Sequence, residues 1–328
     1  MPASEHPPLP VTVIGGYLGA GKTTLVNHLL RHAGGKRLAV LINDFGELPI
    51  DADLIESQND AVISLAGGCL CCSFGSDLLG AVNSLTRRVP RPDQLLIEAS
   101  GVALPDAIAA SLSLLREVAL DALVVVADAD SVRARAADRY LADTIERQLR
   151  AADLVVLNKI DLVPADGRGA LYAWLDSMAP DAKRLDALRG QLPPEAVLGV
   201  EWRARSNRAH PLRGLHSSAG PRPHARQVQF EHLDVTLDAR VDAGALARAL
   251  AQPALGVIRA KGILRDRDGA TIALHLVGTR SEISPRAGNV ECGRLVCIGL
   301  AGRLDRAGIA AALARQQARG RTRRTYVQ

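Results

Sequence analysis

Short apolar runs alternate with amphipathic helical patterns through the first half of the chain. The runs do not alternate strictly with polar residues, which is typical of strands that are buried on both faces of a sheet. They are Val11–Ile14, Leu38–Ile42, Val62–Leu65, Leu95–Ile97, Leu123–Ala127 and Leu154–Leu157, with helical patterns at Thr23–His32, Leu141–Ala151 and Gly169–Met178. Because strands and helices alternate, we expect an α/β fold with a mostly parallel sheet and right-handed crossovers.

The pattern changes near residue 203. Residues 203–226 are rich in Arg, Pro, Gly, Ser and His and show little periodicity, which indicates a linker. Further strands are predicted at Val228–Leu237, Gly256–Leu264, Thr271–Val277 and Arg294–Ile298, and helices at Ala243–Leu250 and Ala307–Arg315. We therefore expect a large domain over residues 1–202, the linker over 203–226 and a smaller α+β domain over 227–328.

Charge and composition exclude some classes of protein. The formal net charge is +5, but residues 315–328 carry five Arg and no acid, so the rest of the chain is close to neutral. A nucleic-acid-binding domain more often has a basic face within the fold, so nucleic acid is an unlikely partner, although the Arg-rich tail leaves a weak RNA contact open. No run approaches the roughly 18 apolar residues of a membrane span, and the Pro-rich start does not resemble a signal peptide. We expect a cytoplasmic protein.

A phosphate-binding motif follows the first predicted strand. The stretch Gly16–Thr23 matches G-x-x-x-x-G-K-[ST], and a helical pattern leaves it, which is the context that such a loop requires. Its backbone N–H groups and the helix N-terminus favour phosphate, while the Lys reaches the terminal phosphates and the Thr hydroxyl ligates Mg²⁺. The predicted nucleotide-binding residues here are Gly16, Gly19, Ala20, Gly21, Lys22, Thr23 and Thr24.

A second motif predicts which base is bound. Asn158, Lys159 and Asp161 form N-K-x-D directly after the apolar run Leu154–Leu157. The carboxylate of Asp161 can accept hydrogen bonds from N1–H and the exocyclic amine of guanine, whereas adenine would leave polar groups unpaired. The stem of Lys159 can lie along the base plane. The predicted nucleotide is therefore GTP.

Two further residues are candidates for the reaction at the terminal phosphate. Glu98 ends the run Leu95–Ile97, where an acid usually supports Mg²⁺, and Gly101 allows a backbone N–H to approach the γ-phosphate. With Lys22 they form the predicted catalytic set. Asp128 and Asp130 also follow a strand, and we interpret them as turn or cap residues.

The cysteines are concentrated in one short segment. Cys69, Cys71 and Cys72 lie within four positions, and thiolates select Zn²⁺ and related soft ions over Mg²⁺. A fourth ligand must come from elsewhere, namely water, Glu47 or a His. Two alternatives remain open: buried cysteines acting as small hydrophobic residues, and a redox role. Cys292 and Cys297 are expected to be inert strand residues.

With these motifs together, the sequence resembles the CobW-like family of P-loop GTPases. The resemblance covers nearly the whole chain, through Gly15–Thr24, Gly68–Cys72 and Asn158–Asp161, and in the C-terminal part through Gly256–Gly262 and Arg294–Gly299. It implies a P-loop NTPase-type domain and a CobW C-terminal-like domain. It also implies a GTPase that binds Zn²⁺, Co²⁺ or Ni²⁺ at the cysteine motif and delivers the metal to a client protein.

The sequence departs from the family pattern at two places. Asp44 stands where the family usually has the longer Glu, and Leu104 replaces an Asp before Pro105. As a mechanism, GTP and Mg²⁺ should order residues 43–51, and Glu47 or Asp44 could link that change to the metal. We expect slow intrinsic hydrolysis, because the sequence shows no obvious catalytic Gln or arginine finger.

Alternative functions and assemblies stay open at this level. One is a regulatory GTPase in which the cysteines are only structural, and another is a ribosome- or RNA-associated factor that uses the Arg tail. A homodimer is also possible.

Overall fold

The computed structural model describes residues 7–43, 62–65, 76–199, 230–286, 288, 290 and 292–321. The predicted linker at 203–226 lies outside these ranges, as do Asp44, Glu47 and the segment with Cys69, Cys71 and Cys72. The expected domain boundaries next to this linker therefore stay predictions. In the described part, no helix is both long enough and apolar enough to cross a bilayer.

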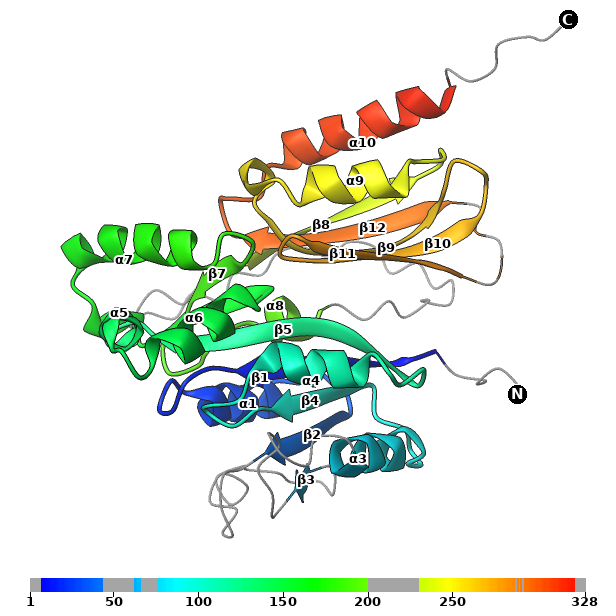
Figure 1. Cartoon of the computed structure of the whole chain (residues 1–328). Coiled ribbons are helices and arrows are strands. Elements are labelled where there is room, and N and C mark those ends of the chain that lie inside the picture. The colour runs from blue at the N-terminus through cyan, green and yellow to red at the C-terminus, as the bar shows by residue number, and fades with distance from the viewer. Residues whose placement is uncertain are drawn as a thin grey trace, which may run out of the picture.

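A seven-stranded sheet forms the first body of the protein (Figure 1). Its strands are β1 (Leu9–Gly15), β2 (Leu38–Asn43), β3 (Val62–Leu65), β4 (Gln94–Glu98), β5 (Val118–Asp128), β6 (Leu154–Asn158) and β7 (Lys183–Asp186). The order is β3-β2-β4-β1-β5-β6-β7, and every neighbouring pair is parallel. This confirms the predicted fold class and all six predicted strands.

Helices cover both faces of this sheet. They are α1 (Lys22–Arg31), α3 (Ser76–Thr86), α4 (Pro105–Leu112), α5 (Val132–Ala137), α6 (Ala142–Arg150), α7 (Ala165–Met178) and α8 (Pro194–Leu198). One apolar cluster joins α1 and α8 to one face, and two others join the opposite face to α3 and α4 and to α5, α6 and α7. The central strands are buried on both sides, which explains their continuous apolar runs.

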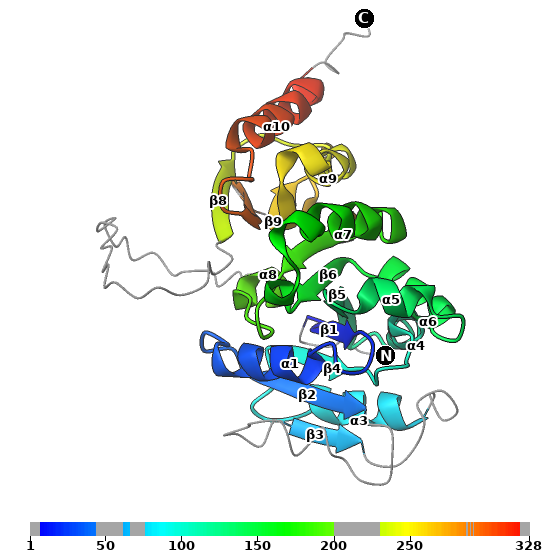
Figure 2. The same cartoon turned by 90° about the vertical axis from the view of Figure 1, so that its left-hand side faces the viewer.

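A five-stranded antiparallel sheet forms the second body. It contains β8 (Phe230–Leu237), β9 (Val257–Arg265), β10 (Thr271–Val277), β11 (Arg280–Pro285) and β12 (Gly293–Leu300), in the order β11-β10-β9-β12-β8. Two helices, α9 (Ala243–Leu250) and α10 (Arg306–Arg321), lie on the side away from the first sheet (Figures 1 and 2). Ile258 and Val277 on the other side join the apolar cluster of α1 and α8, so the two bodies share one core.

A buried ionic cluster joins the two bodies. Asp121 lies at an irregularity of β5, because Leu120 and Ala122 pair with consecutive residues of β1. Its carboxylate accepts a hydrogen bond of 2.6 Å from Nη2 of Arg259 in β9, and it lies 3.2 Å from Nε2 of His275 in β10. Nη1 of Arg259 donates to the carbonyl oxygen of Val197 at 2.6 Å.

A second ion pair lies beside this cluster. Arg280 of β11 donates from Nε and Nη2 to the two carboxylate oxygens of Asp153, both at 2.8 Å, and from Nη2 to the carbonyl oxygen of Asp121 at 2.8 Å. The carboxylate of Asp153 also accepts from the backbone N–H of Leu123. The second sheet is thereby fixed to β5 and to the start of β6.

Burial changes the pKa values in this cluster. Burial lowers the pKa of His275 to about 4, and the attraction of Asp121 offsets only part of that effect. For Asp121, burial by itself would raise the pKa, but the charges of Arg259 and His275 hold it below the ordinary value. At neutral pH the cluster is therefore a neutral imidazole beside an Arg–Asp ion pair.

We predict that Arg259→Met destabilises the protein by about 3–5 kcal/mol, because it leaves the Asp121 carboxylate buried without its main partner. Urea unfolding of the full chain measures this. The control is Arg147→Ala, which removes an exposed pair with Asp143 at 3.9 Å and should cost under about 0.5 kcal/mol. Equal losses in the two variants would contradict the structural role of Arg259.

We also predict a dependence of stability on pH that disappears in His275→Gln. The folded-state pKa of His275 is lowered from 6.5 to about 4. At pH values between these two, His275 is therefore protonated in the unfolded chain and neutral in the folded chain. The contribution of neutral His275 to the free energy of unfolding is fully present above pH 6.5. It declines by up to about 3 kcal/mol as the pH falls towards 4. Urea midpoints from pH 7 to pH 4 should diverge between wild type and variant; parallel curves would contradict the prediction.

Candidate nucleotide-binding site

The P-loop connects the end of β1 to the start of α1. Gly16, Gly19 and Gly21 have φ values of 130°, 75° and 103°, which favour glycine. At two of these positions a side chain would also clash with neighbouring atoms. A Cβ on Gly16 would lie 2.1 Å from the carbonyl oxygen of Val126, and one on Gly21 would lie 2.3 Å from Nδ2 of Asn158. The loop is thus held closely between β5 and the end of β6.

The predicted magnesium ligands come together in the structure. Thr23 Oγ1 donates a hydrogen bond of 2.7 Å to Oε1 of Glu98, and Glu98 is only 2% exposed. Parallel pairing causes this meeting, because Glu98 is aligned with Ile14 of β1, just before the P-loop. A hydroxyl and a carboxylate are the hard oxygen ligands that Mg²⁺ prefers, so this pair fits the ion. Lys22 is buried at the first position of α1.

Asn158 connects two loops of the site. It ends β6 and is 2% exposed. Its Nδ2 donates to the carbonyl oxygen of Ala20 at 2.9 Å, and its Oδ1 accepts from the backbone N–H of Gly190 at 2.9 Å. Asn158 therefore fixes the P-loop relative to the turn around Gly190.

Lys159 and Asp161 directly follow the end of β6. Lys159 has a left-handed conformation with φ 60°, and Asp161 lies in the short 3₁₀ helix Ile160–Leu162 with an exposed side chain. Nζ of Lys159 forms an ion pair of 2.7 Å with Oδ2 of Asp128. A non-glycine residue in this conformation is uncommon and indicates a locally imposed geometry.

Asp128 is the residue whose importance the sequence interpretation missed. It accepts from the backbone N–H of Asp130 at 3.1 Å, as expected of a turn residue, but it also fixes the Lys159 side chain. Burial by itself would raise the pKa of Asp128, yet the hydrogen bond and charge of Lys159 lower it overall. In the sequence Asp128 and Asn158 each directly follow a predicted strand, but only the structure shows that the two positions are paired in register.

Gly101 lies directly against the P-loop. A Cβ at this position would meet Cδ2 of Leu18 at 2.5 Å and its backbone nitrogen at 2.8 Å. The turn after β4 can approach the P-loop this closely only with glycine. The structure thus places Glu98 against Thr23 and Gly101 against Leu18, both along the P-loop.

The predicted metal ligands Cys69, Cys71, Cys72 and Glu47 lie outside the described residues. Among the residues that are described, no group of three or more His, Cys, Asp or Glu side chains could hold a metal ion. Cys297 is buried in β12, and burial raises the pKa of its thiol to about 12, which agrees with an inert residue. Cys292 was expected in the strand, but it is exposed and precedes β12.

Comparison with known proteins supports the reading of both bodies. Residues 10–186 match the family model of the CobW/HypB/UreG nucleotide-binding domain, and residues 230–316 match that of the cobalamin synthesis protein cobW C-terminal domain. The zinc chaperone CobW of Sinorhizobium sp is 32% identical over 292 residues, which cover 79% of each chain. The zinc-regulated GTPase metalloprotein activator 1 of Dictyostelium discoideum is 30% identical over 254 residues, covering 63% of this chain and 53% of that protein.

Among solved structures, the Zn(II)-bound YjiA GTPase from E. coli is similar, with 23% sequence identity, a TM-score of 0.40, and 95% of this chain and 99% of that chain covered.

The family assignment rests on the sequence matches. The fold and the P-loop define a P-loop nucleotide-binding protein. The chain belongs to the CobW/HypB/UreG family, and this membership confirms the predicted class of enzyme, a GTPase. The roles of individual site residues stay predictions.

We predict that Asp161→Asn changes the preferred base from guanine to xanthine. The Asn amide would present a donor where guanine also presents a donor, whereas xanthine has a carbonyl oxygen there. Affinity for GDP should fall by at least about a hundredfold while affinity for xanthosine diphosphate rises, as measured by titration. Asp166→Asn, a nearby exposed acid of α7, is the control. An unchanged preference in Asp161→Asn would place the base elsewhere.

Proposed function

We propose that this chain is a GTP-dependent metal chaperone. It binds Zn²⁺, Co²⁺ or Ni²⁺ through Cys69, Cys71 and Cys72, and GTP binding and hydrolysis control transfer of the metal to a client protein. Glu47 is the proposed protein ligand that completes the site. The bound metal is cargo, whereas Mg²⁺ supports the nucleotide and would be held by Thr23 and Glu98.

The observation that carries this proposal is the alignment of strand ends in the first sheet. Leu65 at the end of β3 pairs with Asn43 at the end of β2, and Glu98 pairs with Ile42 and with Ile14. Parallel pairing thus starts the cysteine segment, the segment with Glu47 and the P-loop from the same edge.

Chain length limits the distance between the two sites. Cys69 and Glu47 each follow the end of their strand by four residues, a reach of roughly 14 Å for an extended chain. Neighbouring strands lie about 4.8 Å apart, so β3 and β1 are separated by roughly 15 Å across the sheet. The segments that follow β2 and β3 are therefore long enough to reach both a metal held by the cysteines and a γ-phosphate held by the P-loop.

The chemistry of the ligands fits soft-metal cargo. Thiolates select Zn²⁺ and similar ions, and three thiolates with Glu47 at a replaceable fourth position favour exchange over permanent storage. The names of the relatives from Sinorhizobium sp and Dictyostelium discoideum refer to zinc, which agrees with this choice. Binding of nucleotide and metal would be reciprocally linked: whatever the metal does to GTP affinity, GTP does to metal affinity.

The test compares GTP hydrolysis with and without Zn²⁺ or Co²⁺ in wild type, Cys71→Ala and the control Cys292→Ala. Cys292 is an exposed cysteine outside the motif. We expect metal to change the rate severalfold in wild type and in the control, and to leave Cys71→Ala unaffected. Equal rates in every condition would defeat the proposal and leave a GTPase whose cysteines are structural.

A further inference from the structure

A buried glutamine holds the turn that follows β4. Gln148 of α6 is 1% exposed, and its Nε2 donates to the carbonyl oxygens of Gly101 at 3.2 Å and of Ala103 at 2.9 Å. The turn itself is closed by a hydrogen bond of 3.0 Å from Ala103 N to the carbonyl oxygen of Ser100. Both hydrogen bonds of this buried amide go to the turn rather than to its own helix. The amide therefore stabilises the conformation of that turn.

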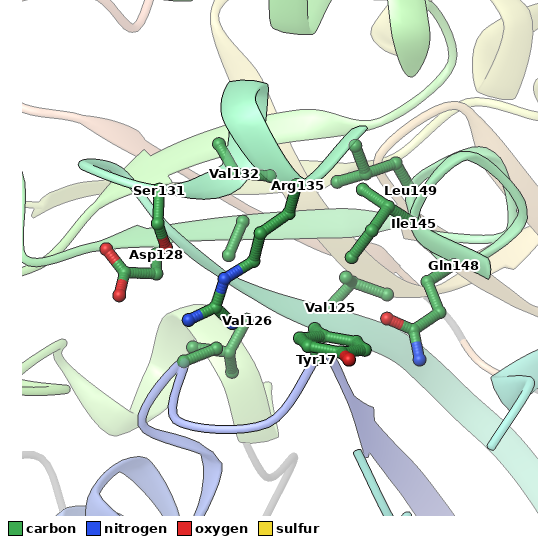
Figure 3. A pocket seen from close by; sticks show the side chains of 12 residues that line it. Tyr17, Val125, Val126, Asp128, Ser131, Val132, Arg135, Ile145, Gln148 and Leu149 are labelled. Atoms are coloured by element: carbon green, nitrogen blue, oxygen red, sulfur yellow. The ribbon is translucent and has the colours of Figure 1, made fainter. Parts of the chain in front are cut away.

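An arginine on the neighbouring helix holds the P-loop in a similar way. Nη1 of Arg135 in α5 donates to the carbonyl oxygen of Leu18 at 2.7 Å, and its guanidinium lies 5.1 Å from the centre of the Tyr17 ring. Helices α5 and α6 pack against each other. Figure 3 shows Arg135, Tyr17 and Gln148 around the same pocket.

These contacts form a closed arrangement. Leu18 and Gly101 touch each other, Arg135 holds the first, Gln148 holds the second, and the two helices that carry them are packed together. The distance between the P-loop and the Gly101 turn is therefore determined by two helices, α5 and α6, rather than by the loops themselves. Removing the Gln148 amide is costly, because it leaves the buried carbonyl oxygen of Gly101 without its donor.

We propose that Gln148 and Arg135 are positioning residues that determine how well the protein discriminates GTP from GDP. This inference rests on the proposed function and on the prediction from the sequence that the N–H of Gly101 contacts the γ-phosphate. GDP has no γ-phosphate and does not use the turn, so only GTP affinity depends on where the turn is held. Hydrolysis depends on the same placement, since a γ-phosphate bound in a loosened site is less well oriented.

The first test is Gln148→Met, which keeps the side-chain length and removes the donor. Binding of GDP and of a non-hydrolysable GTP analogue is measured by titration on the full chain with Mg²⁺. We expect analogue affinity to fall roughly tenfold, as for the loss of one or two net hydrogen bonds, and GDP affinity to stay within about twofold. The matched control is Gln252→Met, which removes an exposed glutamine amide that bonds Arg248 in the second body.

A second variant adds a pH signature that a purely structural role would not give. In Gln148→Glu a carboxylate faces two carbonyl oxygens at neutral pH, while the protonated acid can donate again. The selectivity for the GTP analogue over GDP should be lowest at pH 8 and recover as the pH falls. Arg135→Met should lower selectivity in the same direction, and because Arg135 is only partly buried it decides the question if the Gln148 variants do not fold.

The outcomes separate this inference from the proposed function. Wild-type protein that binds neither nucleotide would overturn the proposed function. Wild type that discriminates between the nucleotides, with Gln148→Met and Arg135→Met retaining that discrimination, would overturn only this inference. An equal fall in affinity for both nucleotides would also overturn it, because that result indicates general loosening of the P-loop.

Discussion

Parallel strand pairing is the constraint on which the structure depends. It brings the carboxyl ends of β1, β4, β5 and β6 to one edge of the sheet, where β1 leads into the P-loop and the other three strands end in Glu98, Asp128 and Asn158. Thr23 meets Glu98 and Lys159 meets Asp128 only because neighbouring strands end in register. The same alignment starts the cysteine segment and the P-loop from a common edge, and this connects the proposed metal site to the nucleotide site.

The second body is attached far from that edge. Its buried ion pairs go to Asp121 early in β5 and to Asp153 just before β6, whereas the P-loop and the N-K-x-D motif lie where β1 and β6 end. The anchor combines a shared apolar core with buried ion pairs that would be costly to break. The antiparallel sheet is thus anchored near the start of β5 and β6, away from the ends of these strands.

Much of the fold could be predicted from the sequence, because apolar runs and helical periodicity mark buried elements directly. Two strands were missed for a physical reason: β7 (Lys183–Asp186) and β11 (Arg280–Pro285) lie at the edges of their sheets and carry polar side chains. The motif residues around Gly16 and Asn158 were recognised from local spacing. Contacts between distant segments, such as Lys159 with Asp128 and Gln148 with Gly101, leave no local pattern and had to be seen in three dimensions.

The proposed function requires that the nucleotide site and the thiolate site change each other's affinity. Its most direct test is the Zn²⁺ dissociation constant of the reduced protein, measured once with a non-hydrolysable GTP analogue and once with GDP, and then the reverse titration of each nucleotide with and without Zn²⁺. Linkage predicts that the two nucleotides give different Zn²⁺ affinities, and that Zn²⁺ changes the ratio of the nucleotide affinities by the same factor. Identical Zn²⁺ affinities with both nucleotides would contradict the account.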